Sequence, residues 1–312
     1  MHRRDDTRGP TAAPTHGVPT SDLVATIPSV DARLDQPRRL RAVLRSVDGL
    51  LIDVDGVLVQ QERPIDGAAD ALRRLAADGV PYRLATNTSL VSRDTLARQA
   101  AKLGLAVEAG HILSALSASA ALTRRRFAGR PLFVLCSPDA RAEFAGQRLL
   151  EPEEADADGA DCAAVVIGDA PEALTFDNLD RAFRLVRGGA RLVAMHRNPW
   201  WLTPRGPTLD AGAFVVGLEY ATHRRALLAG KPAAAFFREA AHQLGLEPSR
   251  VAMVGDDLVS DIAGAQRAGL RAIWVRTGRH GPADLSAARS RANGTPDAIA
   301  QDLRAVVAAR SA

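Results

Sequence analysis

With 312 residues, 46% of them hydrophobic and 24% charged, the chain has the composition of a globular protein with room for one or two domains. No apolar run approaches the roughly 20 residues of a membrane span, and the net charge of +4 is too small and too dispersed to indicate nucleic-acid binding. The two cysteines form no CxxC pair, which argues against a disulfide framework or a cysteine metal site and makes the cytoplasm the predicted location.

The N-terminal segment is predicted to be a disordered tail. Residues 1–38 are polar and charged, lack a sustained apolar period and contain five prolines, at positions 10, 14, 19, 28 and 37. Aspartates among the arginines argue against an organelle transit peptide, and the lack of an apolar stretch argues against a signal peptide.

Strands and helices then alternate. Residues 49–54 form an apolar run typical of a buried parallel strand, and a second such run spans residues 81–85. Apolar residues at helical spacing predict helices over residues 66–77 and from Ser92 to Gly104. This alternation is typical of βαβ units, which form a parallel sheet covered by helices on both faces.

The middle of the chain has the same pattern with longer loops. Its predicted elements are strands at 131–135, 163–167 and 191–195, helices at 179–186 and 213–221, a solvated acidic loop at 151–161, and a hairpin or loop with an aromatic centre at 196–212. After residue 226 the first pattern of short loops between strands and helices resumes, with a helix after Pro232, strands at 251–254 and 273–275 and a helix at 260–268. We therefore predict an α/β protein whose core, residues 39–115 and 224–312, is interrupted by an inserted α/β cap domain, residues 116–223.

Polar residues gather where the predicted core strands end. In open parallel sheets, ligands bind beyond the carboxyl ends of the strands. The residues predicted at this edge are Asp53 and Asp55, Thr86 and Asn87, Lys231, and Asp256 and Asp257. We expect them to form one site.

The charge of these residues calls for a cation. Asp53 and Asp55, two apart on an extended segment, would point the same way, and one would be protonated unless a cation were present. Asp256 and Asp257 add negative charge. Oxygen ligands favour Mg²⁺, and no histidine or cysteine is placed to favour zinc.

Lysine is rare in this chain, because Lys102 and Lys231 are its only lysines and the other 38 of the 40 basic residues are arginine. A lysine kept against such a bias suggests a need for its compact ammonium group. Lys231 also precedes a predicted helix start, where a nearby anion would best explain a positive charge. Lys102 is more simply a surface residue.

Together these groups suit phosphoryl transfer. One aspartate of the pair could attack phosphorus and form an aspartyl-phosphate, while the other serves as general acid and then base. Lys231 would neutralise phosphate charge, and Thr86 with nearby backbone amides would donate hydrogen bonds.

Four segments resemble a known family. DVDGVL at residues 53–58, Thr86 with Asn87, GKP at 230–232 and GDDLVSD at 255–261 resemble, in order, the four motifs of the haloacid dehalogenase-like hydrolase (HAD) superfamily. The insert between the second and third motifs resembles class IIA, which includes NagD-type and p-nitrophenyl phosphatases. The segment AGAFVVGLEYAT, residues 211–222, is most similar to the subgroup containing phospholysine phosphohistidine inorganic pyrophosphate phosphatase.

The resemblance implies a Rossmann-like three-layer core and a Mg²⁺-dependent phosphatase acting on a small phosphorylated molecule, without nucleic-acid or membrane partners. It implies these roles: Asp53 as nucleophile, Asp55 as acid/base, Thr86, Asn87 and Lys231 on the phosphate, Asp53, Asp256 and the Asp55 backbone carbonyl on the metal, and Asp261 in support. Asp257 is either a second metal ligand or, more simply, a supporting residue that makes hydrogen bonds within its loop. A homodimer formed through the cap is a further expectation.

The cap departs from NagD-type relatives, which have a glycine-rich loop where this chain has Asn198, Pro199, Trp200 and Trp201. Asn198, Trp200 and Trp201 are candidates for substrate specificity, although packing of the two tryptophans within the hairpin is at least as good an explanation. His196 is expected to be structural.

Three other functions fit the same residues less well. A catalytically weak relative acting as a binding or regulatory protein remains the alternative, although Asp55 is present. A phosphoacceptor receiver domain fits poorly, because its paired acids precede the phosphorylated aspartate. No GxGxxG follows the first strand, which argues against dinucleotide binding.

Overall fold

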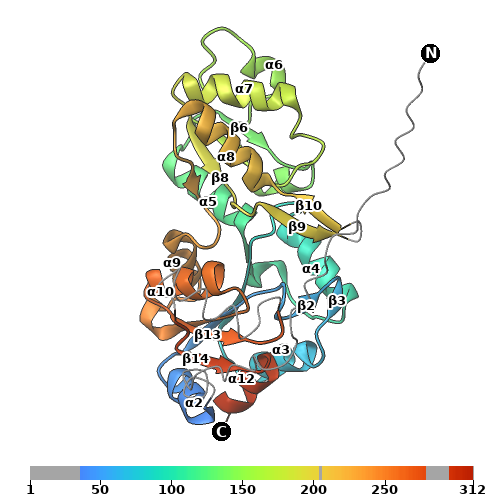
Figure 1. The fold of residues 1–312 in the computed structure, drawn as a ribbon, viewed down its shortest axis with the longest axis vertical. Helices are drawn as coiled ribbons and strands as arrows, with labels where there is room; N and C mark the ends of the chain where they lie inside the picture. The colour runs from blue at the N-terminus through green and yellow to red at the C-terminus, as the bar shows by residue number, and fades with distance from the viewer. Residues whose placement is uncertain (1–35, 204–205, 279–294, 312) are drawn as a thin grey trace, which may run out of the picture.

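The computed structural model describes residues 36–203, 206–278 and 295–311 (Figure 1). The predicted disordered tail lies outside these residues except for its last three. Helix α2, Pro37–Arg45, begins there and buries Leu40, Val43 and Leu44. The predicted end of the tail at residue 38 is therefore too late, because an apolar helical stripe starts at Leu40.

The core is built on a six-stranded parallel sheet in the order β14-β13-β12-β1-β4-β5. Its strands are β1 Gly49–Ile52, β4 Tyr82–Thr86, β5 Ile112–Ser114, β12 Val251–Gly255, β13 Arg271–Val275 and β14 Ala298–Ala300. Strand β1 lies between β12 and β4, with Ile52 opposite both Val254 and Leu84. The carboxyl ends of these three strands are therefore adjacent.

Helices cover both faces of this sheet. Successive residues of β1 belong to different apolar clusters: Leu50 and Ile52 pack with α2, α3 Ala68–Ala77 and α12 Leu303–Arg310, whereas Leu51 packs with α9 Ala234–Gln243. The other core helices are α4 Arg93–Lys102, the π-helical turn η4 Leu258–Ala263 and α10 Gly264–Arg267, with 3₁₀ turns η1 Ala109–His111 and η3 Pro248–Arg250. The predicted three-layer α/β core is confirmed.

A second parallel sheet forms the cap, in the order β11-β8-β7-β6. Its strands are β6 Leu132–Leu135, β7 Ala164–Ile167, β8 Arg191–Ala194 and β11 Leu227–Leu228, and its helices are α5 Ala115–Arg126, η2 Ala140–Phe144, α6 Pro152–Ala155, α7 Phe176–Arg187 and α8 Ala211–Thr222. Two antiparallel pairs complete the fold, β2 Val59–Gln60 with β3 Arg63–Pro64 and β9 Trp200–Thr203 with β10 Gly206–Leu209. Figure 1 shows the cap stacked above the core.

Two predictions about the cap need correction. The acidic segment 151–161 is not entirely loop, because Pro152 at the first helical position and a capping box between Glu151 and Glu154 start helix α6. Strand β11 pairs with β8 in the cap sheet, although residue 224 was the predicted start of the second core half. The remaining domain boundaries stay predictions.

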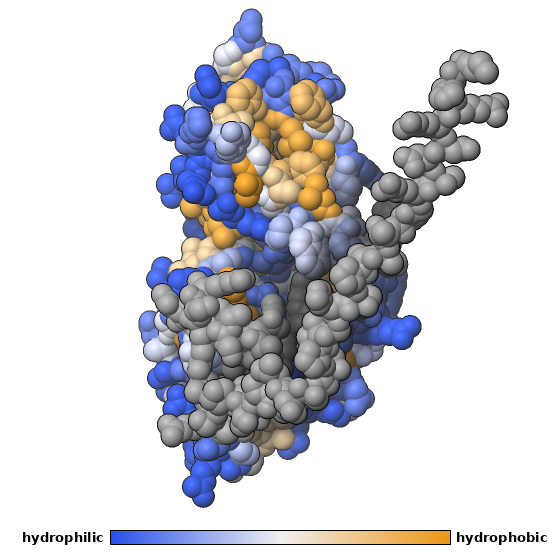
Figure 2. All heavy atoms as spheres, viewed as in Figure 1, coloured by the Kyte–Doolittle hydropathy of each residue, from blue (hydrophilic) through white to orange (hydrophobic). Residues whose placement is uncertain are grey.

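The surface of the cap carries exposed apolar side chains. Figure 2 shows hydrophobic residues grouped on this part of the molecule, and Val216 on α8 is 48% exposed. The homodimer through the cap stays a prediction. None of the helices in the described part of the chain combines the length and the hydropathy required to cross a bilayer.

Candidate active site

The predicted polar residues meet at the carboxyl edge of the core sheet. Asp53 directly follows β1, Thr86 is the last residue of β4, and Asp256 directly follows β12. Because these strands are neighbours, residues far apart in sequence come together there. All three side chains are buried.

Lys231 lies at the centre of the site. Its Nζ donates hydrogen bonds to Asp53 Oδ1 and to Asp261 Oδ1, both at 2.7 Å. Lys231 is 3% exposed and Asp261 is fully buried. Burial opposes the charge on the lysine, but the two carboxylates outweigh it and hold the lysine pKa above its usual range. The Lys231 ammonium is therefore charged at neutral pH.

Asn87 holds the backbone of Lys231. Its Oδ1 accepts from the Lys231 amide at 2.8 Å, and its Nδ2 donates to the Lys231 carbonyl at 3.1 Å. Gly230 allows this close approach, because a Cβ there would lie 2.8 Å from Asn87 Oδ1 and 2.5 Å from the Met195 carbonyl oxygen. Both ends of the Asn87 amide are thus engaged with Lys231, and its predicted contact with phosphate stays a prediction.

The carboxylate of Asp53 has an unusual environment. Its pKa is raised to about 6, mainly by burial and further by the negative charges of Asp256 and Asp55, while Lys231 opposes the shift. Oδ1 also accepts from the Val54 amide at 2.8 Å. One lysine does not balance this group of carboxylates, so an additional cation would stabilise the ionised form.

A group of three carboxylates fits a hard divalent cation. Oxygen atoms of Asp53, Asp256 and Asp261 all lie within 4.8 Å of one another. Oxygen donors of this kind are those that Mg²⁺ prefers. The Asp256 carboxylate is enclosed by two glycines, since a Cβ on Gly56 or Gly278 would lie 2.5 or 1.8 Å from its Oδ2. The donor set and the tight enclosure suit a small cation.

Asp257 and Asp261 belong to the turn that follows β12. Asp257 Oδ1 accepts from the amides of Val259 and Ser260 at 2.9 and 2.7 Å, and so caps η4. Its own amide donates to Asp261 Oδ2 at 3.1 Å. Asp257 thus has the loop-stabilising contacts expected for a supporting residue, whereas Asp261 lies inside the carboxylate group.

Asp55 differs from Asp53 in its surroundings. Strand β1 ends at Ile52, the chain bends at Val54, and Asp55 is exposed while Asp53 is 6% exposed. The expectation that the pair would point the same way assumed an extended segment, and that segment ends too early. The two carboxyl groups therefore differ in their exposure to solvent, and their distinct catalytic roles stay a prediction.

The predicted cap residues lie on or before the β9–β10 hairpin. Trp200 and Trp201 are 49% and 47% exposed. The Asn198 carbonyl accepts from the Gly212 amide at 3.1 Å, at the start of α8. Their predicted role in specificity stays a prediction.

A polar cluster between cap and core was missed from the sequence. Ser89 Oγ donates to Asp169 Oδ2 at 2.8 Å, and His196 Nε2 lies 3.0 Å from the same oxygen and 3.8 Å from Asp210 Oδ1. Asp169 follows β7 and His196 follows β8. The rule that located Asp53 and Asp256 at strand ends would have found them, had it been applied to the cap sheet.

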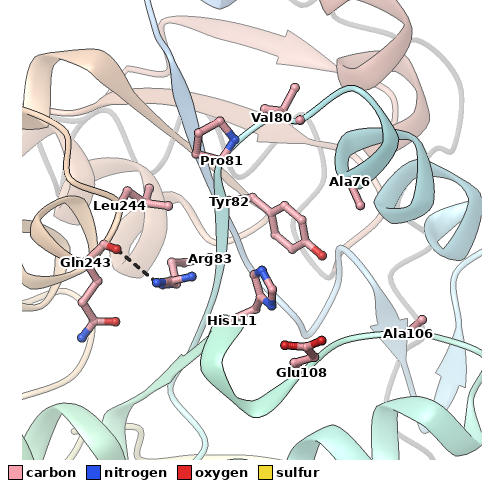
Figure 3. Close-up of a pocket in the computed structure, with 11 residues that line it drawn as sticks. Ala76, Val80, Pro81, Tyr82, Arg83, Ala106, Glu108, His111, Gln243 and Leu244 are labelled. Atoms are coloured by element: carbon pink, nitrogen blue, oxygen red, sulfur yellow. Dashed lines mark hydrogen bonds between the residues drawn. The ribbon is translucent and has the colours of Figure 1, made fainter.

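A cavity of about 480 Å³ lies at the amino-terminal end of strand β4, opposite to the carboxyl edge (Figure 3). Tyr82 and His111 stack there with ring centroids 5.2 Å apart, and Arg83 Nη2 donates to the Gln243 carbonyl at 3.1 Å. Arg83 Nε and His111 Nδ1 have no hydrogen-bond partner, but both atoms are buried from solvent, so a molecule in the cavity could not reach them without side-chain movement. The cavity is separate from the carboxylate group, since Tyr82 and Thr86 are at opposite ends of β4.

Comparisons with known proteins place this geometry in a family. The haloacid dehalogenase-like hydrolase model matches residues 50–149, and the HAD-hydrolase-like model matches residues 228–306. The chain is 37% identical over 243 residues to haloacid dehalogenase-like hydrolase domain-containing protein 2 of Bos taurus, covering 78% of this chain and 89% of the relative. The chain belongs to the haloacid dehalogenase-like hydrolases.

Further relatives within the HAD family agree with class IIA, which is the class that the insertion point of the cap indicates. Phospholysine phosphohistidine inorganic pyrophosphate phosphatase of Danio rerio is 34% identical over 270 residues, covering 85% of this chain and 94% of the relative. The crystal structure of glycerol phosphate phosphatase from Mycobacterium tuberculosis in complex with magnesium has a TM-score of 0.74 at 28% identity, covering 85% of this chain and 77% of that chain. The predicted family and class are confirmed.

Proposed function

We propose that this HAD hydrolase is a Mg²⁺-dependent phosphatase that acts on a small phosphate ester. The observation that carries the proposal is the buried Lys231 ammonium, bonded at 2.7 Å to Asp53 and to Asp261 beside the Asp256 carboxylate. Such a site combines a nucleophilic carboxylate with cationic groups for phosphate oxygens. Two relatives named as phosphatases support the same conclusion.

Asp53 is the proposed nucleophile. Its carboxylate oxygen forms a bond to phosphorus while the bond from phosphorus to the leaving-group oxygen breaks, which produces an aspartyl-phosphate. Asp55, which is an exposed residue two positions after Asp53, donates a proton to the leaving group. It then takes a proton from the water that releases phosphate and regenerates Asp53.

The other residues hold the phosphate and the charge. Lys231 neutralises phosphate oxygens, and the Thr86 hydroxyl with nearby backbone amides donates hydrogen bonds. Asp53, Asp256 and the Asp55 backbone carbonyl are the proposed ligands of Mg²⁺, which when bound would offset the negative charge of the carboxylates and the phosphate. Asp257 and Asp261 keep the turn after β12 and the lysine in place.

The cap favours small substrates, because it contacts the loop that follows Thr86, through the hydrogen bond from Ser89 to Asp169, and lies above the core in Figure 1. A small leaving group fits such an enclosed site better than a folded protein surface does. Asn198, Trp200 and Trp201 are the proposed residues that select the leaving group.

The nucleophile can be tested with a panel of phosphate esters in the presence of Mg²⁺. Asp53→Asn is expected to lower kcat/KM by at least about a thousandfold, because the amide cannot attack phosphorus at a useful rate. Asp70→Asn is the matched control, since Asp70 is an exposed residue of α3 that pairs with Arg73 one turn away. Phosphate release should be measured together with thermal unfolding. Undiminished release by Asp53→Asn would contradict the mechanism, and no release by the wild-type protein from any ester would contradict the proposed function.

A further inference from the structure

The segment that follows the phosphate-binding residues is held by the cap. Thr86 ends β4, and the chain continues through Asn87 and Thr88 into residues 89–93, four of which hydrogen-bond to cap residues. The contacts are Ser89 Oγ to Asp169 Oδ2 at 2.8 Å, Ser137 Oγ to the Leu90 carbonyl, the Ser92 amide to Asp139 Oδ2 at 2.6 Å and Arg93 Nε to Glu143 Oε1 at 3.0 Å. The contact at Ser89 is the nearest to the phosphate-binding residues.

Ser89 is fixed by a reciprocal pair of hydrogen bonds. Its hydroxyl donates to Asp169 Oδ2 and accepts from the Asp169 amide, both at 2.8 Å. Ser89 is fully buried. Gly168 permits the approach, because a Cβ there would lie 3.0 Å from Ser89 Oγ and 2.3 Å from Met195 Sδ. The hydroxyl is therefore set by both the backbone and the side chain of one cap residue.

Asp169 is in turn held by two other cap residues. His196 lies 3.0 Å from Asp169 Oδ2 and is 1% exposed, and Asp210 is buried beside it. Burial disfavours the charged form of Asp169, but hydrogen bonds with His196, Asp210 and Ser89 outweigh it and keep the pKa of Asp169 below its usual range. Asp169 is thus a charged acceptor in a fixed position, and hydrogen bonds to charged groups are the stronger ones.

A metal ion is a poor explanation for this cluster. The Asn198 amide donates to His196 Nδ1 at 3.3 Å, so this nitrogen is an acceptor and the ring proton is on Nε2, directed at Asp169. A metal on Nε2 would move that proton to Nδ1, where it would face the Asn198 amide hydrogen. The cluster is a hydrogen-bonded unit.

We propose that Asp169 is a positioning residue, which fixes residues 86–89 through Ser89 and so sets the phosphate-binding groups when the cap is docked. The loop is tied to the core on its other side by the two hydrogen bonds between Asn87 and the Lys231 backbone. Thr86 Oγ1 accepts from the Thr88 amide at 3.1 Å, which makes the loop compact and transmits the position of Ser89 to Thr86. The inference rests on the proposed phosphatase function.

The test measures phosphate binding separately from turnover. Affinity for inorganic phosphate is determined by calorimetry in MgCl₂, and KM and kcat are determined with p-nitrophenyl phosphate. Asp169→Ala and Ser89→Ala are each expected to weaken phosphate binding and raise KM by about tenfold, with a smaller change in kcat, because each removes a hydrogen bond to a charged group. The Kd for phosphate of the double variant should be at most about twice that of either single variant, because both substitutions remove the same contact. Asp169→Asn, which keeps an acceptor for Ser89, should recover most of the affinity.

Asp139→Ala provides the matched control. Asp139 is also a cap carboxylate that accepts from the core segment, from the Ser92 amide and from Thr95 Oγ1 at 2.9 Å, but it lies farther along the chain from Thr86. It should change phosphate affinity by less than about twofold, as expected for a contact outside the loop. The inference would be overturned if Asp139→Ala and Asp169→Ala lost phosphate affinity equally, or if the two losses of affinity multiplied in the Asp169→Ala, Ser89→Ala double variant. Unchanged phosphate affinity in Asp169→Ala would also overturn it. Absence of ester hydrolysis by the wild type would instead contradict the proposed function, because the calorimetric comparison needs no turnover.

Discussion

Lys231 is the residue on which the charges of the site depend. It is the only cation bonded to Asp53 and Asp261 in the hydrogen bonds and ion pairs of the described residues. Its compact ammonium contacts two carboxylates at once. The planar guanidinium of an arginine would require a different arrangement of the two carboxylates. The composition of the chain agrees, since only two of its 40 basic residues are lysines.

Replacing Lys231 should therefore destabilise the fold. Lys231→Met is expected to lower the free energy of unfolding by about 3 kcal/mol or more, because it leaves two buried carboxylates without their partner. Lys102→Met is the control: the only other lysine is exposed at the end of α4, and its loss should cost less than about 0.5 kcal/mol. Urea denaturation with a chelator present measures both. Adding Asp261→Asn to Lys231→Met should restore part of the stability, and a further loss of stability would contradict this account.

Single residues also mark what the sequence could predict at the site. Asp53, Thr86, Lys231 and Asp256 were found because each follows a readable apolar run, and topology then brings them together. The different exposure of Asp53 and Asp55 was not predictable, because it depends on where β1 stops and where the chain bends. The pairing of Asn87 with the Lys231 backbone is a contact between residues 144 positions apart, and no local pattern indicates it.

The turns beside the strands shape the site as much as the strands do. Gly56 has φ of +81°, and a Cβ there would lie 2.5 Å from Asp256 Oδ2. The turn after β1 therefore encloses the carboxylate that follows β12. A side chain at this turn would have to displace Asp256.

This enclosure predicts a selective effect on metal affinity. Gly56→Ala should raise the Mg²⁺ concentration needed for half-maximal activity by about tenfold or more, because it moves a proposed ligand. Gly79→Ala is the matched control, since Gly79 has φ of +65° but no atom within 4 Å of an added Cβ. Both variants should lose about 1 kcal/mol of stability from backbone strain. A Mg²⁺ titration that gives the same midpoint for both variants would contradict the prediction.

Elements were predictable where an apolar period is long or clear. Residues 92–104 are one example, because Ser92 accepts from the Thr95 amide and caps α4 as its position suggested. Short elements were harder. Strand β14 has three residues, and β5 also has three and leads directly into α5, so neither gives a period that can be separated from its surroundings. Residues 260–268, predicted as one helix, are a π-helical turn followed by α10, because Asp257 caps the turn and Asp261 is drawn into the site.

The stability of the whole molecule should depend on pH through the cap cluster. The pKa of Asp210 is raised to about 7 by burial and by the neighbouring Asp169, while His196 opposes the shift. Between about pH 4 and pH 7 the folded protein holds a proton that the unfolded chain has released. The contribution of Asp210 to the free energy of unfolding therefore falls as the pH rises through that window.

Asp210→Asn should remove this contribution. Its free energy of unfolding, followed by urea denaturation from pH 4 to pH 7, is expected to fall less steeply than that of the wild type. Asp139→Asn is the control, because the pKa of Asp139 is lowered by its hydrogen bonds with Ser92, and its contribution changes only below this window. Groups outside the cap cluster, Asp53 among them, cancel in the comparison. Parallel curves for wild type and Asp210→Asn would contradict the prediction.

At the scale of the whole chain, the two-part architecture was predictable from the repeated alternation of strands and helices. The way in which the parts are joined was not. Contacts such as Ser89 with Asp169 are made between the core and the cap, each of which has its own sheet. Sequence spacing says which residues end a strand, but not which strand ends of two different sheets face each other.

The return of the chain from the cap has a consequence for protein engineering. Leu227 and Leu228 pair with β8, the amides of Ala229 and Gly230 donate to the carbonyls of Ala194 and Met195, and Lys231 follows at once. The lysine is thus the next residue after a ladder that belongs to the cap sheet. A chimera that receives a cap from another relative has to keep this ladder in register, because inserting one residue after Leu228 would turn the ammonium away from Asp53.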